Sequence, residues 1–404
     1  MDCVIEKVML KTFLIIDCFL TCILYAKFPR NTLIFHYMTK KIINLSLSIF
    51  LIFSMISCEN KNQAKNGDNA EIKNIIFLIG DGMGLSTVYA AMTISDHPLN
   101  IERCTSYGFI KTYSLDNYIT DSAAGGTAMA SGKKTNNGVI CQDPQGNKYK
   151  SILEIAEENG RATGLVATSA ITHATPASFI AHESDRDNYE AIARDFLDTD
   201  IDVFIGGGYD HFAKRSDNLN LIDSLLKRGY EVDTSLSMIQ NSSAIKLAGF
   251  TAPVNNPYRL NGRGDMLPVS TEKAIQILSK NRKGFFLMVE GSQIDFAAHN
   301  KDAESLVDET LDFDNAVGVA LDFAEKDGHT LVLVTADHET GGVNIVGGDI
   351  VSRTTKLYFS SYGHTAVMVP VYAYGPGSGK FAGIYDNTAI FHKLLSLSGF
   401  RKRI

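Results

Sequence analysis

Acidic and histidine side chains stand at the ends of several apolar runs in this sequence. "FLIGDG" carries Asp81, "LVLVTADHETGG" carries Asp337 and His338, and "SYGHTAVMV" places His364 just before another run. Carboxylate and imidazole ligands without cysteine are typical of zinc, and sets made only of oxygen suit harder ions such as magnesium. The sequence therefore predicts a metal site, and its candidate ligands are Asp81, Glu290, Asp295, His299, Asp337, His338 and His364.

The pair Asp295 and His299 shows why the set matters more than any single member. The two residues are four apart in "EGSQIDFAAH", so on a helix they would share one face and could bind one ion. Taken alone, the pair is explained as well by a helix N-terminal acid and a solvated histidine. Asp337 and His338 are adjacent, and both can reach one ion only where the strand breaks, which the following Glu-Thr-Gly-Gly predicts.

The stretch "ITDSAAGGTAMASGKKT" (119–135) places a serine directly after an acid and before a run of very small side chains. These residues alone leave two interpretations open: tight packing of another helix, or close approach of a substrate to Ser122. Backbone N–H groups and the helix dipole favour an anion at a helix start. We expect Ser122 to begin a helix after Asp121, residues 123–126 to leave room for a phosphate and metals, and residues 128–132 to pack closely.

The elements that must position these residues alternate along the chain. Continuous apolar runs predict buried strands at 73–82, 162–170, 201–208, 284–292, 329–339 and 365–375. Helical patterns are found between them at 151–160, 220–229, 269–281 and 305–327. This order predicts an α/β fold, with a mostly parallel central sheet and helices on both faces, in a single catalytic domain with small insertions. In such sheets the site lies beyond the carboxyl ends of the strands. Residues 232–265 have weak periodicity, so we expect a peripheral, loop-rich insertion there.

The N-terminal part is typical of a targeting segment. Lys40 and Lys41 precede an apolar run of signal-peptide length at 42–56. The run ends in "SMISC", which resembles a bacterial lipobox with Cys58 as the lipidated residue; the alternative is an ordinary signal peptide with an incidental cysteine. We expect Met38 to be the true start. Residues 1–57 would then be a signal or targeting segment, 58–73 a flexible tether, and 74–404 the catalytic domain of an exported, periplasmic or cell-envelope lipoprotein.

Composition narrows the class of partner. The chain has 404 residues, of which 45% are hydrophobic, enough for a full globular core. A formal net charge of −7 argues against a general affinity for nucleic acid, and we expect no nucleic-acid-binding module. In an exported protein Cys104 and Cys141 could form a disulfide, but two thiols alone do not establish one.

Six motifs in this chain resemble those of the alkaline phosphatase family and occur in the same order. They are "FLIGDGMG", "TDSAAGGTAMASG", "HATPASFIAHESDR", "EGSQID", "TADHETGG" and "GHTAVMVPVYAYGPG", which together span residues 77–377. The resemblance implies that Ser122 is the phosphorylated serine, in contact with metal, and that Arg186 binds two phosphate oxygens. It also implies three metal sites: a first zinc on Asp295, His299 and His364, a second zinc on Asp81, Asp337 and His338, and a magnesium on Asp81, Thr175 and Glu290.

Two positions depart from the family pattern. His173, which we expect behind the metal ligands, occupies a position where some bacterial members have Asp and animal members have His. Phe296 stands where other members have Lys or His near the phosphate and the magnesium, so it puts in question both phosphate binding and the third metal site. The segment 338–364 is short, and a reduced surface insertion is expected. Without the resemblance, Arg186 in "ESDRDNYEAIARD" would be interpreted as a surface helix charge.

We therefore expect hydrolysis of small phosphate monoesters to alcohol and inorganic phosphate, through a phosphoserine, with two zinc ions and one magnesium as cofactors. One alternative is a phosphodiesterase or another hydrolase of the same superfamily. The other is a non-catalytic, lipid-anchored protein that binds metal or phosphate. No predicted nucleophile or ligand is missing from the chain, which favours the enzyme. The resemblance further implies a homodimer. We expect a pH optimum above neutrality, because metal-bound oxygens and the alcohol step favour deprotonated forms.

Overall fold

The computed structural model describes residues 71–400 of the chain. The predicted targeting segment, the candidate start Met38, the candidate lipid anchor Cys58 and most of the predicted tether lie outside the described residues. The end of that tether already belongs to the fold, because Ile72 is buried and Arg161 donates hydrogen bonds to the backbone oxygens of Ile72 and Lys73. Within residues 71–400, no helix has the length and apolar character needed to cross a membrane.

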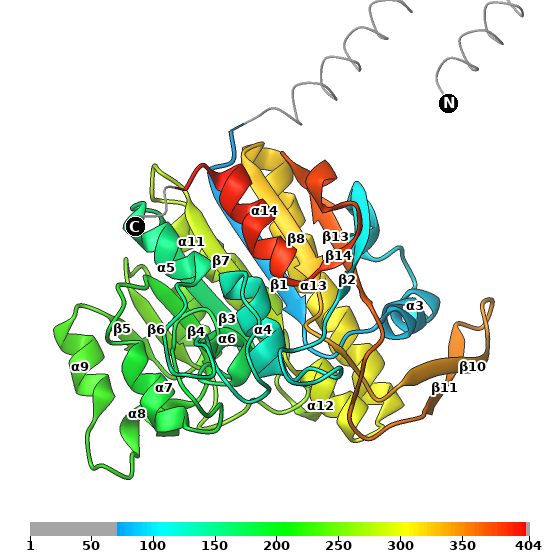
Figure 1. Ribbon diagram of the computed structural model, residues 1–404, viewed down its shortest axis with the longest axis horizontal. Helices are drawn as coiled ribbons and strands as arrows, with labels where there is room; N and C mark the ends of the chain where they lie inside the picture. Colours follow the sequence, from blue (N-terminus) through cyan, green and yellow to red (C-terminus); the bar gives the residue numbers. More distant parts are fainter. Residues whose placement is uncertain (1–70, 401–404) are drawn as a thin grey trace, which may run out of the picture. The chain divides into compact units, whose positions relative to one another are not determined.

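A ten-stranded sheet forms the centre of the described fold, in the order β14-β2-β13-β8-β1-β7-β3-β4-β6-β5 (Figure 1). All neighbouring strands pair in parallel except β13, which is antiparallel to both β2 and β8. The predicted α/β fold with a mostly parallel sheet is confirmed. The strands are β1 (Asn74–Gly80), β2 (Ser106–Lys111), β3 (Ala162–Ala170), β4 (Val203–Gly207), β5 (Glu231–Asp233), β6 (Leu247–Phe250), β7 (Phe285–Gly291), β8 (Thr330–Thr335), β13 (Val369–Tyr374) and β14 (Gly383–Asp386).

Helices cover both faces of this sheet (Figure 1). Phe285 and Phe286 are adjacent in β7 and must point to opposite faces. Phe285 packs on Phe323 of α13, and Phe286 packs on Phe179 just after α6, with ring centroids 5.8 and 6.0 Å apart. The helices are α3 (Leu85–Ile94), α4 (Ser122–Ser131), α5 (Ile152–Glu158), α6 (Ala174–Ala177), α7 (Tyr189–Asp195), α8 (Tyr209–Ala213), α9 (Leu221–Lys227), α10 (Leu236–Asn241), α11 (Met266–Leu278), α12 (Gln293–His299), α13 (Ala303–Asp327) and α14 (Thr388–Ser398), with short 3₁₀ turns at Asn100–Arg103, Arg259–Asn261 and Ser378–Phe381.

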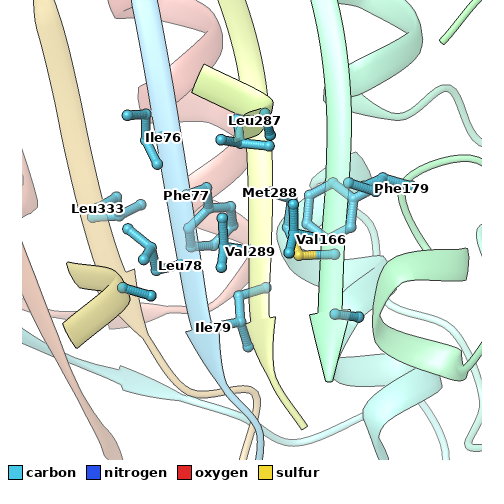
Figure 2. Packing of buried hydrophobic residues seen from close by; sticks show 14 of the residues in the cluster. Ile76, Phe77, Leu78, Ile79, Val166, Phe179, Leu287, Met288, Val289 and Leu333 are labelled. Carbon is cyan, nitrogen blue, oxygen red and sulfur yellow. The ribbon is translucent and has the colours of Figure 1, made fainter. Parts of the chain in front are cut away.

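The core is densest where the central strands lie between the helix layers. Figure 2 shows Phe77 of β1, Met288 of β7 and Phe179 among the buried side chains that pack along the central strands. Phe77 and Phe179 meet edge to face, with centroids 6.0 Å apart and planes at 75°. Every residue of β1, β7 and β8 is buried, which explains why these strands are continuous apolar runs without alternation.

All six predicted strands exist, but the chain contains more sheet than its patterns predicted. The interpretation of residues 232–265 as a loop-rich insertion is wrong for its first half, which supplies the end of β5, helix α10 and strand β6. β5 has three residues and β6 has four, too few for a periodic pattern. The sequence also could not indicate that β13 runs against its neighbours, because the apolar run of a buried strand does not encode direction.

Two small sheets lie outside the main one. β9 (Glu339–Thr340) pairs with β12 (His364–Thr365), and β10 (Val343–Asp349) with β11 (Thr354–Phe359) forms the hairpin that occupies the short segment between His338 and His364. Cys104 and Cys141 are both buried and free, so the candidate disulfide is not formed.

Candidate active site

The polar groups that follow the strands meet at one edge of the main sheet. In the register of the sheet, Ile79 of β1 lies between Glu290 of β7 and Thr335 of β8. Asp81 follows β1 by one residue, and Asp337 lies two residues beyond Thr335. Parallel strands that end level with one another therefore bring these carboxylates together, as the sequence predicts.

Two histidines in this cluster have their protonation fixed by backbone carbonyls. The Nδ1 atom of His299 lies 2.7 Å from the carbonyl oxygen of Tyr362, and that of His364 lies 2.9 Å from the carbonyl oxygen of Thr120. A carbonyl can only accept, so each Nδ1 carries a proton and each Nε2 is the atom left to bind a metal. Imidazoles held in this way by their other nitrogen are typical of metal ligands.

The two Nε2 atoms and Asp295 form a triangle of suitable size for zinc. The nitrogens of His299 and His364 are 3.1 Å apart, and Asp295 Oδ1 lies 3.4 and 3.7 Å from them. Tetrahedral ligands at about 2.0 Å from zinc stand about 3.3 Å from one another. The prediction that Asp295 and His299 share a helix face also holds, since both lie on α12.

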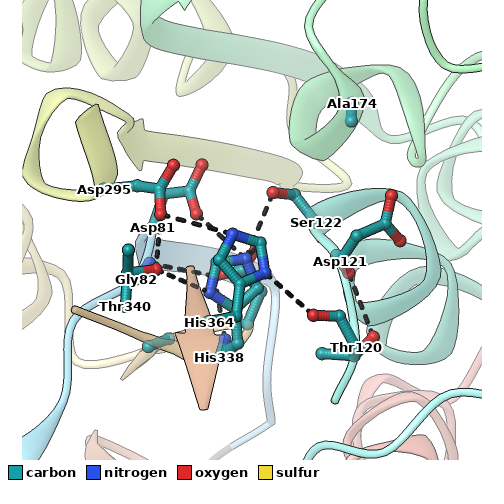
Figure 3. Close-up of polar contacts among 12 residues, drawn as sticks. Asp81, Gly82, Thr120, Asp121, Ser122, Ala174, Asp295, His338, Thr340 and His364 are labelled. Carbon is teal, nitrogen blue, oxygen red and sulfur yellow. Dashed lines mark hydrogen bonds and ion pairs between the residues drawn. The ribbon is translucent and has the colours of Figure 1, made fainter. Parts of the chain in front are cut away.

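His338 stands at the centre of a second group, which is completely buried. Its Nε2 atom lies 3.2 Å from Asp337 Oδ2, 3.5 Å from Asp81 Oδ1 and 3.2 Å from Ser122 Oγ. Figure 3 shows Ser122 and the acids converging on the stacked rings of His338 and His364. The strand does break after Thr335, and the two-residue pairing of β9 with β12 then holds His364 beside this group.

Thr340 connects the two groups. Its hydroxyl lies 2.5 Å from Asp295 Oδ1 and 3.1 Å from Nδ1 of His338. The hydroxyl has one proton, which goes to the carboxylate, so its lone pair accepts from the imidazole N–H. This arrangement directs Nε2 of His338 toward Ser122 and the acids.

A third group contains Asp81, Glu290 and His173, whose ligand atoms lie within 4.8 Å of one another. Ser169 and Ser292 donate to Oε2 of Glu290, whereas its Oε1 has no hydrogen-bond partner. The other buried polar atoms here without a hydrogen-bond partner are both carboxylate oxygens of Asp81, Oδ2 of Asp337, Oγ1 of Thr175 and Nδ1 of His173. Buried polar atoms without partners are costly, and a cation would satisfy these oxygens, so the donor set fits a metal cluster.

Burial and mutual repulsion set the protonation of the acids in the absence of a cation. Burial raises the pKa of Glu290 to about 7 and that of Asp337 to about 6. The pKa of Asp81 is also raised, first by burial and then by Asp337 and Asp295. Burial lowers the pKa of His338 well below its usual value, so this imidazole is neutral and able to act as a ligand. A cation among these acids would favour their ionised forms.

Asp121 holds both the helix of Ser122 and the side chain of Arg186. Its Oδ1 caps α4 by accepting from Ala124 N–H at 3.0 Å. Its Oδ2 accepts from Arg186 Nη1 and from Gly138 N–H, each at 2.9 Å. Arg186 lies in the loop before α7, not in a surface helix, and its side chain is 21% exposed. Ser122 begins α4, as predicted.

The small residues after Ser122 do not leave an open space, contrary to our expectation for 123–126. All of α4 is buried, and Ser122 is its only residue that lines the adjoining cavity. A Cβ on Gly125 would stand 3.2 Å from the Cβ and carbonyl oxygen of Asp337, and one on Gly126 would stand 2.8 Å from Ser178 Oγ. The small residues therefore let the metal-binding loop and the segment after α6 approach the helix.

A cavity of about 620 Å³ adjoins the cluster, and its lining includes Ser122, Arg186, Asp295, His299 and His364. His173 and Phe296 also line it, with their rings packed edge to face at 5.6 Å. Burial and the neighbouring Arg186 lower the pKa of His173 to about 3. Phe296 thus covers a neutral imidazole with an apolar ring.

The model of the alkaline phosphatase family matches residues 72–357. The chain belongs to the alkaline phosphatase family. Alkaline phosphatase 3 of Bacillus subtilis is 36% identical to it, in an alignment that covers 87% of this chain and 95% of that protein. Alkaline phosphatase from the Antarctic bacterium TAB5 superposes with a TM-score of 0.79 at 42% identity, over 82% of this chain and 100% of that one. This alkaline phosphatase is therefore a phosphate monoester hydrolase.

All the residues that the family resemblance assigned to the site lie in one region of the structure. The ligand atoms within 4.8 Å of one another form three sets, on Asp295, His338 and His364, on Asp81, Asp337 and His338, and on Asp81, His173 and Glu290. His173, expected behind the ligands, contributes to the third of these. The resemblance placed Thr175 there instead, and its hydroxyl is buried without a hydrogen-bond partner.

Sequence reasoning missed two side chains that position predicted site residues. Asp121 fixes Arg186, and Thr340 fixes His338. A serine preceded by an acid at a helix start, and a threonine two residues after "DH", are weak signals that could have pointed to them. The carbonyls of Thr120 and Tyr362 carry no signal, because every residue has one.

Proposed function

We propose that this enzyme hydrolyses phosphate monoesters through a phosphoserine on Ser122, with two zinc ions and one magnesium bound beside it. The observation that supports this most directly is that neutral imidazole nitrogens and unpartnered carboxylate oxygens converge around Ser122 Oγ. The first zinc would be held by Asp295, His299 and His364, the second by Asp81, Asp337 and His338 with Ser122 in contact, and magnesium by Asp81, Thr175 and Glu290. Magnesium is bound in the site called M3 of a TAB5 alkaline phosphatase mutant, a relative 42% identical to this chain.

Arg186, Asp121 and Ser122 divide the work of binding and reaction. Arg186 donates from Nη1 to Asp121. The remaining N–H groups of its planar guanidinium are available to pair with two phosphate oxygens. Ser122 Oγ forms a bond to phosphorus as the bond to the alcohol oxygen breaks, and water then cleaves the phosphoserine. Two inversions give net retention at phosphorus. When bound, the metals would supply positive charge that lowers the pKa of the serine hydroxyl and stabilises the departing alcohol oxygen.

The decisive experiment compares Ser122→Ala with Ser131→Ala, at the other end of the same helix. Ser131 is also buried and donates to the carbonyl of Thr127 at 2.7 Å, so its loss controls for damage to α4. Ser122→Ala should abolish p-nitrophenyl phosphate hydrolysis and the phosphoprotein trapped by acid quenching, while zinc content stays unchanged. Ser131→Ala should keep both. Wild-type turnover in Ser122→Ala would reject the assigned nucleophile.

We further propose that monoesters are favoured over diesters and sulfates. A phosphate monoester dianion has three non-bridging oxygens, so Arg186 can pair with two of them and leave the third for the metals. A diester has only two such oxygens and a single charge, and a sulfate monoester also has a single charge. Rates for p-nitrophenyl phosphate, its methyl or phenyl diester and p-nitrophenyl sulfate should therefore fall in that order by large factors. A diester rate within tenfold of the monoester rate would contradict this proposal.

The proposals on location and assembly rest on the sequence and the family. The enzyme would be exported and anchored to the cell envelope through lipidated Cys58, and would form a homodimer. Cys58→Ser should move phosphatase activity from the membrane to the soluble fraction with unchanged kcat/KM. Light scattering of the purified enzyme should give the mass of two chains. Activity that stays with the membrane, or the mass of one chain, would reject the corresponding proposal.

A further inference from the structure

The cavity beside the proposed nucleophile is also lined by residues that take no part in the chemistry described above. Six of these residues are polar amides or a phenol: Asn255, Asn256, Tyr258, Asn261, Gln293 and Asn300. We propose that this group, here called the amide wall, recognises the alcohol part of the substrate and selects a sugar or another polyhydroxylated alcohol. The inference rests on the proposed phosphomonoesterase function and specifies its substrate class.

Asn256 and Gln293 have unused hydrogen-bonding capacity at the cavity. Asn256 is 5% exposed, and its Nδ2 has no hydrogen-bond partner. Gln293 is 2% exposed and donates through Nε2 to the carbonyl of Asn256 at 2.7 Å, which leaves its Oε1 as an acceptor. A buried donor without a partner is costly unless a ligand supplies one. The hydroxyl of an alcohol can both accept from the donor and donate to the acceptor.

Tyr258 adds an oriented hydroxyl. Asn300 Nδ2 lies 2.8 Å from the phenolic oxygen and can only donate to it. The phenolic proton is therefore free to point elsewhere, and both residues line the cavity. Asn255 is oriented in the same way, since its Oδ1 accepts from Ala170 N–H at 2.8 Å and its Nδ2 remains to donate.

Ion pairs, buried at Arg263 and partly exposed at Arg259, hold the amide wall in place before any substrate arrives. Arg263, whose side chain is 1% exposed, lies 2.6 Å from both Glu309 and Asp312 of α13. Arg259 lies 2.7 Å from Asp308 of the same helix. The segment 255–263 is thus fixed to the longest helix of the described fold on either side of Asn261, and its polar groups are pre-organised, which lowers the entropy lost on binding.

The distribution of charge distinguishes the part of the cavity proposed to bind the alcohol from the part proposed to bind the phosphate. Among the residues that line the cavity, the charged side chains Arg186 and Asp295 belong to the phosphate and metal end, and the amide wall itself carries no charge. A wall of neutral donors and acceptors offers no counter-ion to a cationic or second anionic group. The apolar ring of Phe296 borders the amides and can pack on the C–H face of a sugar ring. A cavity of about 620 Å³ exceeds what phosphate alone needs and falls within the range of ligand sites.

The test compares two phosphates of similar size on the full-length enzyme. Glucose 6-phosphate and cyclohexylmethyl phosphate both release a primary alcohol with a six-membered ring, but only the first carries hydroxyls. We expect kcat/KM to favour glucose 6-phosphate by about tenfold or more, because each well-placed neutral hydrogen bond gives roughly threefold to tenfold. Tyr258→Phe and Asn256→Leu should each lower that ratio by roughly threefold to tenfold.

Three further measurements separate recognition from general damage. Inhibition by inorganic phosphate and turnover of cyclohexylmethyl phosphate should not change in either variant, because neither depends on the amide wall. Tyr209→Phe, a half-buried tyrosine that does not line the cavity, should leave the ratio unchanged. A wild-type ratio within twofold of one, or a ratio that neither variant alters, would overturn the inference while phosphomonoesterase activity stands. Failure to hydrolyse p-nitrophenyl phosphate as well would instead overturn the proposed function.

Discussion

Thr340→Val tests whether side chains that never touch substrate determine metal affinity. Valine has nearly the shape of threonine but cannot form hydrogen bonds. It would leave Asp295 Oδ1 and Nδ1 of His338 without the hydroxyl that now lies 2.5 and 3.1 Å from them. Both groups are buried, so water does not replace the lost contacts without rearrangement. The two proposed zinc sites would be affected together, because Thr340 bridges one proposed ligand of each.

The size of the effect follows from these two contacts. A hydrogen bond to a charged carboxylate contributes about 1.5–3 kcal/mol, and one between neutral groups about 1 kcal/mol. Part of this lost free energy also destabilises the metal-free protein, and that part does not change the metal affinity. Removal of such partners generally weakens metal binding by about 10- to 100-fold. That range corresponds to ~1.4–2.7 kcal/mol, which is consistent with the loss of the charged contact alone.

Competition with a chelator of known affinity gives the zinc dissociation constants. Thr335→Val is a matched control, because Thr335 is equally buried and donates to the carbonyl of Pro370 at 2.8 Å, outside the ligand cluster. Both variants should lose stability to urea, and only Thr340→Val should lose zinc. Equal zinc affinity in wild type and Thr340→Val, or an equal loss in Thr335→Val, would refute the reasoning.

Three other predictions follow from burial and close approach. Gly125→Ala should keep the chelated protein folded, since alanine favours a helix, but should weaken zinc binding measurably in chelator competition because its Cβ would press on Asp337 at 3.2 Å; unchanged affinity would contradict this. Burial raises the pKa of Glu290 to about 7 and that of Asp337 to about 6, so the chelated protein should lose stability as pH rises from about 4.5 to 7, where only the unfolded chain has released these protons; a chelated protein that resists urea better at pH 8 than at pH 5 would contradict this. Burial also raises the pKa of Glu157 to about 7, so Glu157→Gln should stabilise the protein by about 1–2 kcal/mol at pH 8 and have little effect at pH 5, a difference that thermal unfolding at the two pH values would detect.

The parts of the fold that the sequence predicted share one physical cause. β1 and β8 are buried on both faces, so nearly every residue must be apolar, and the acid that follows each strand stands out against that background. Asp81 and Asp337 were found in this way. β6 is also buried, but it is four residues long, and its "LAGF" cannot be distinguished from part of a helix or loop.

The parts that the sequence did not predict depend on contacts between distant segments. The carbonyl of Thr120 orients His364 across 244 residues, and any residue type could provide it. The role of Gly125 depends on which loop packs against α4, and that loop is known only once the sheet order is known. Sequence patterns therefore identified the candidate ligands, whereas their orientation required the structure.

Asp121 shows how such contacts affect reactivity. One carboxylate caps the helix that begins with Ser122 and also binds Arg186, so the proposed nucleophile and the proposed phosphate-binding group have a common support. A shift of one relative to the other would cost rate steeply, because reacting groups must be held close to their productive geometry. The side chain of Arg186 remains 21% exposed and would otherwise sample many rotamers. The ion pair with Asp121 removes that freedom before phosphate binds. The fold therefore positions the guanidinium, and less binding free energy is spent on ordering this side chain.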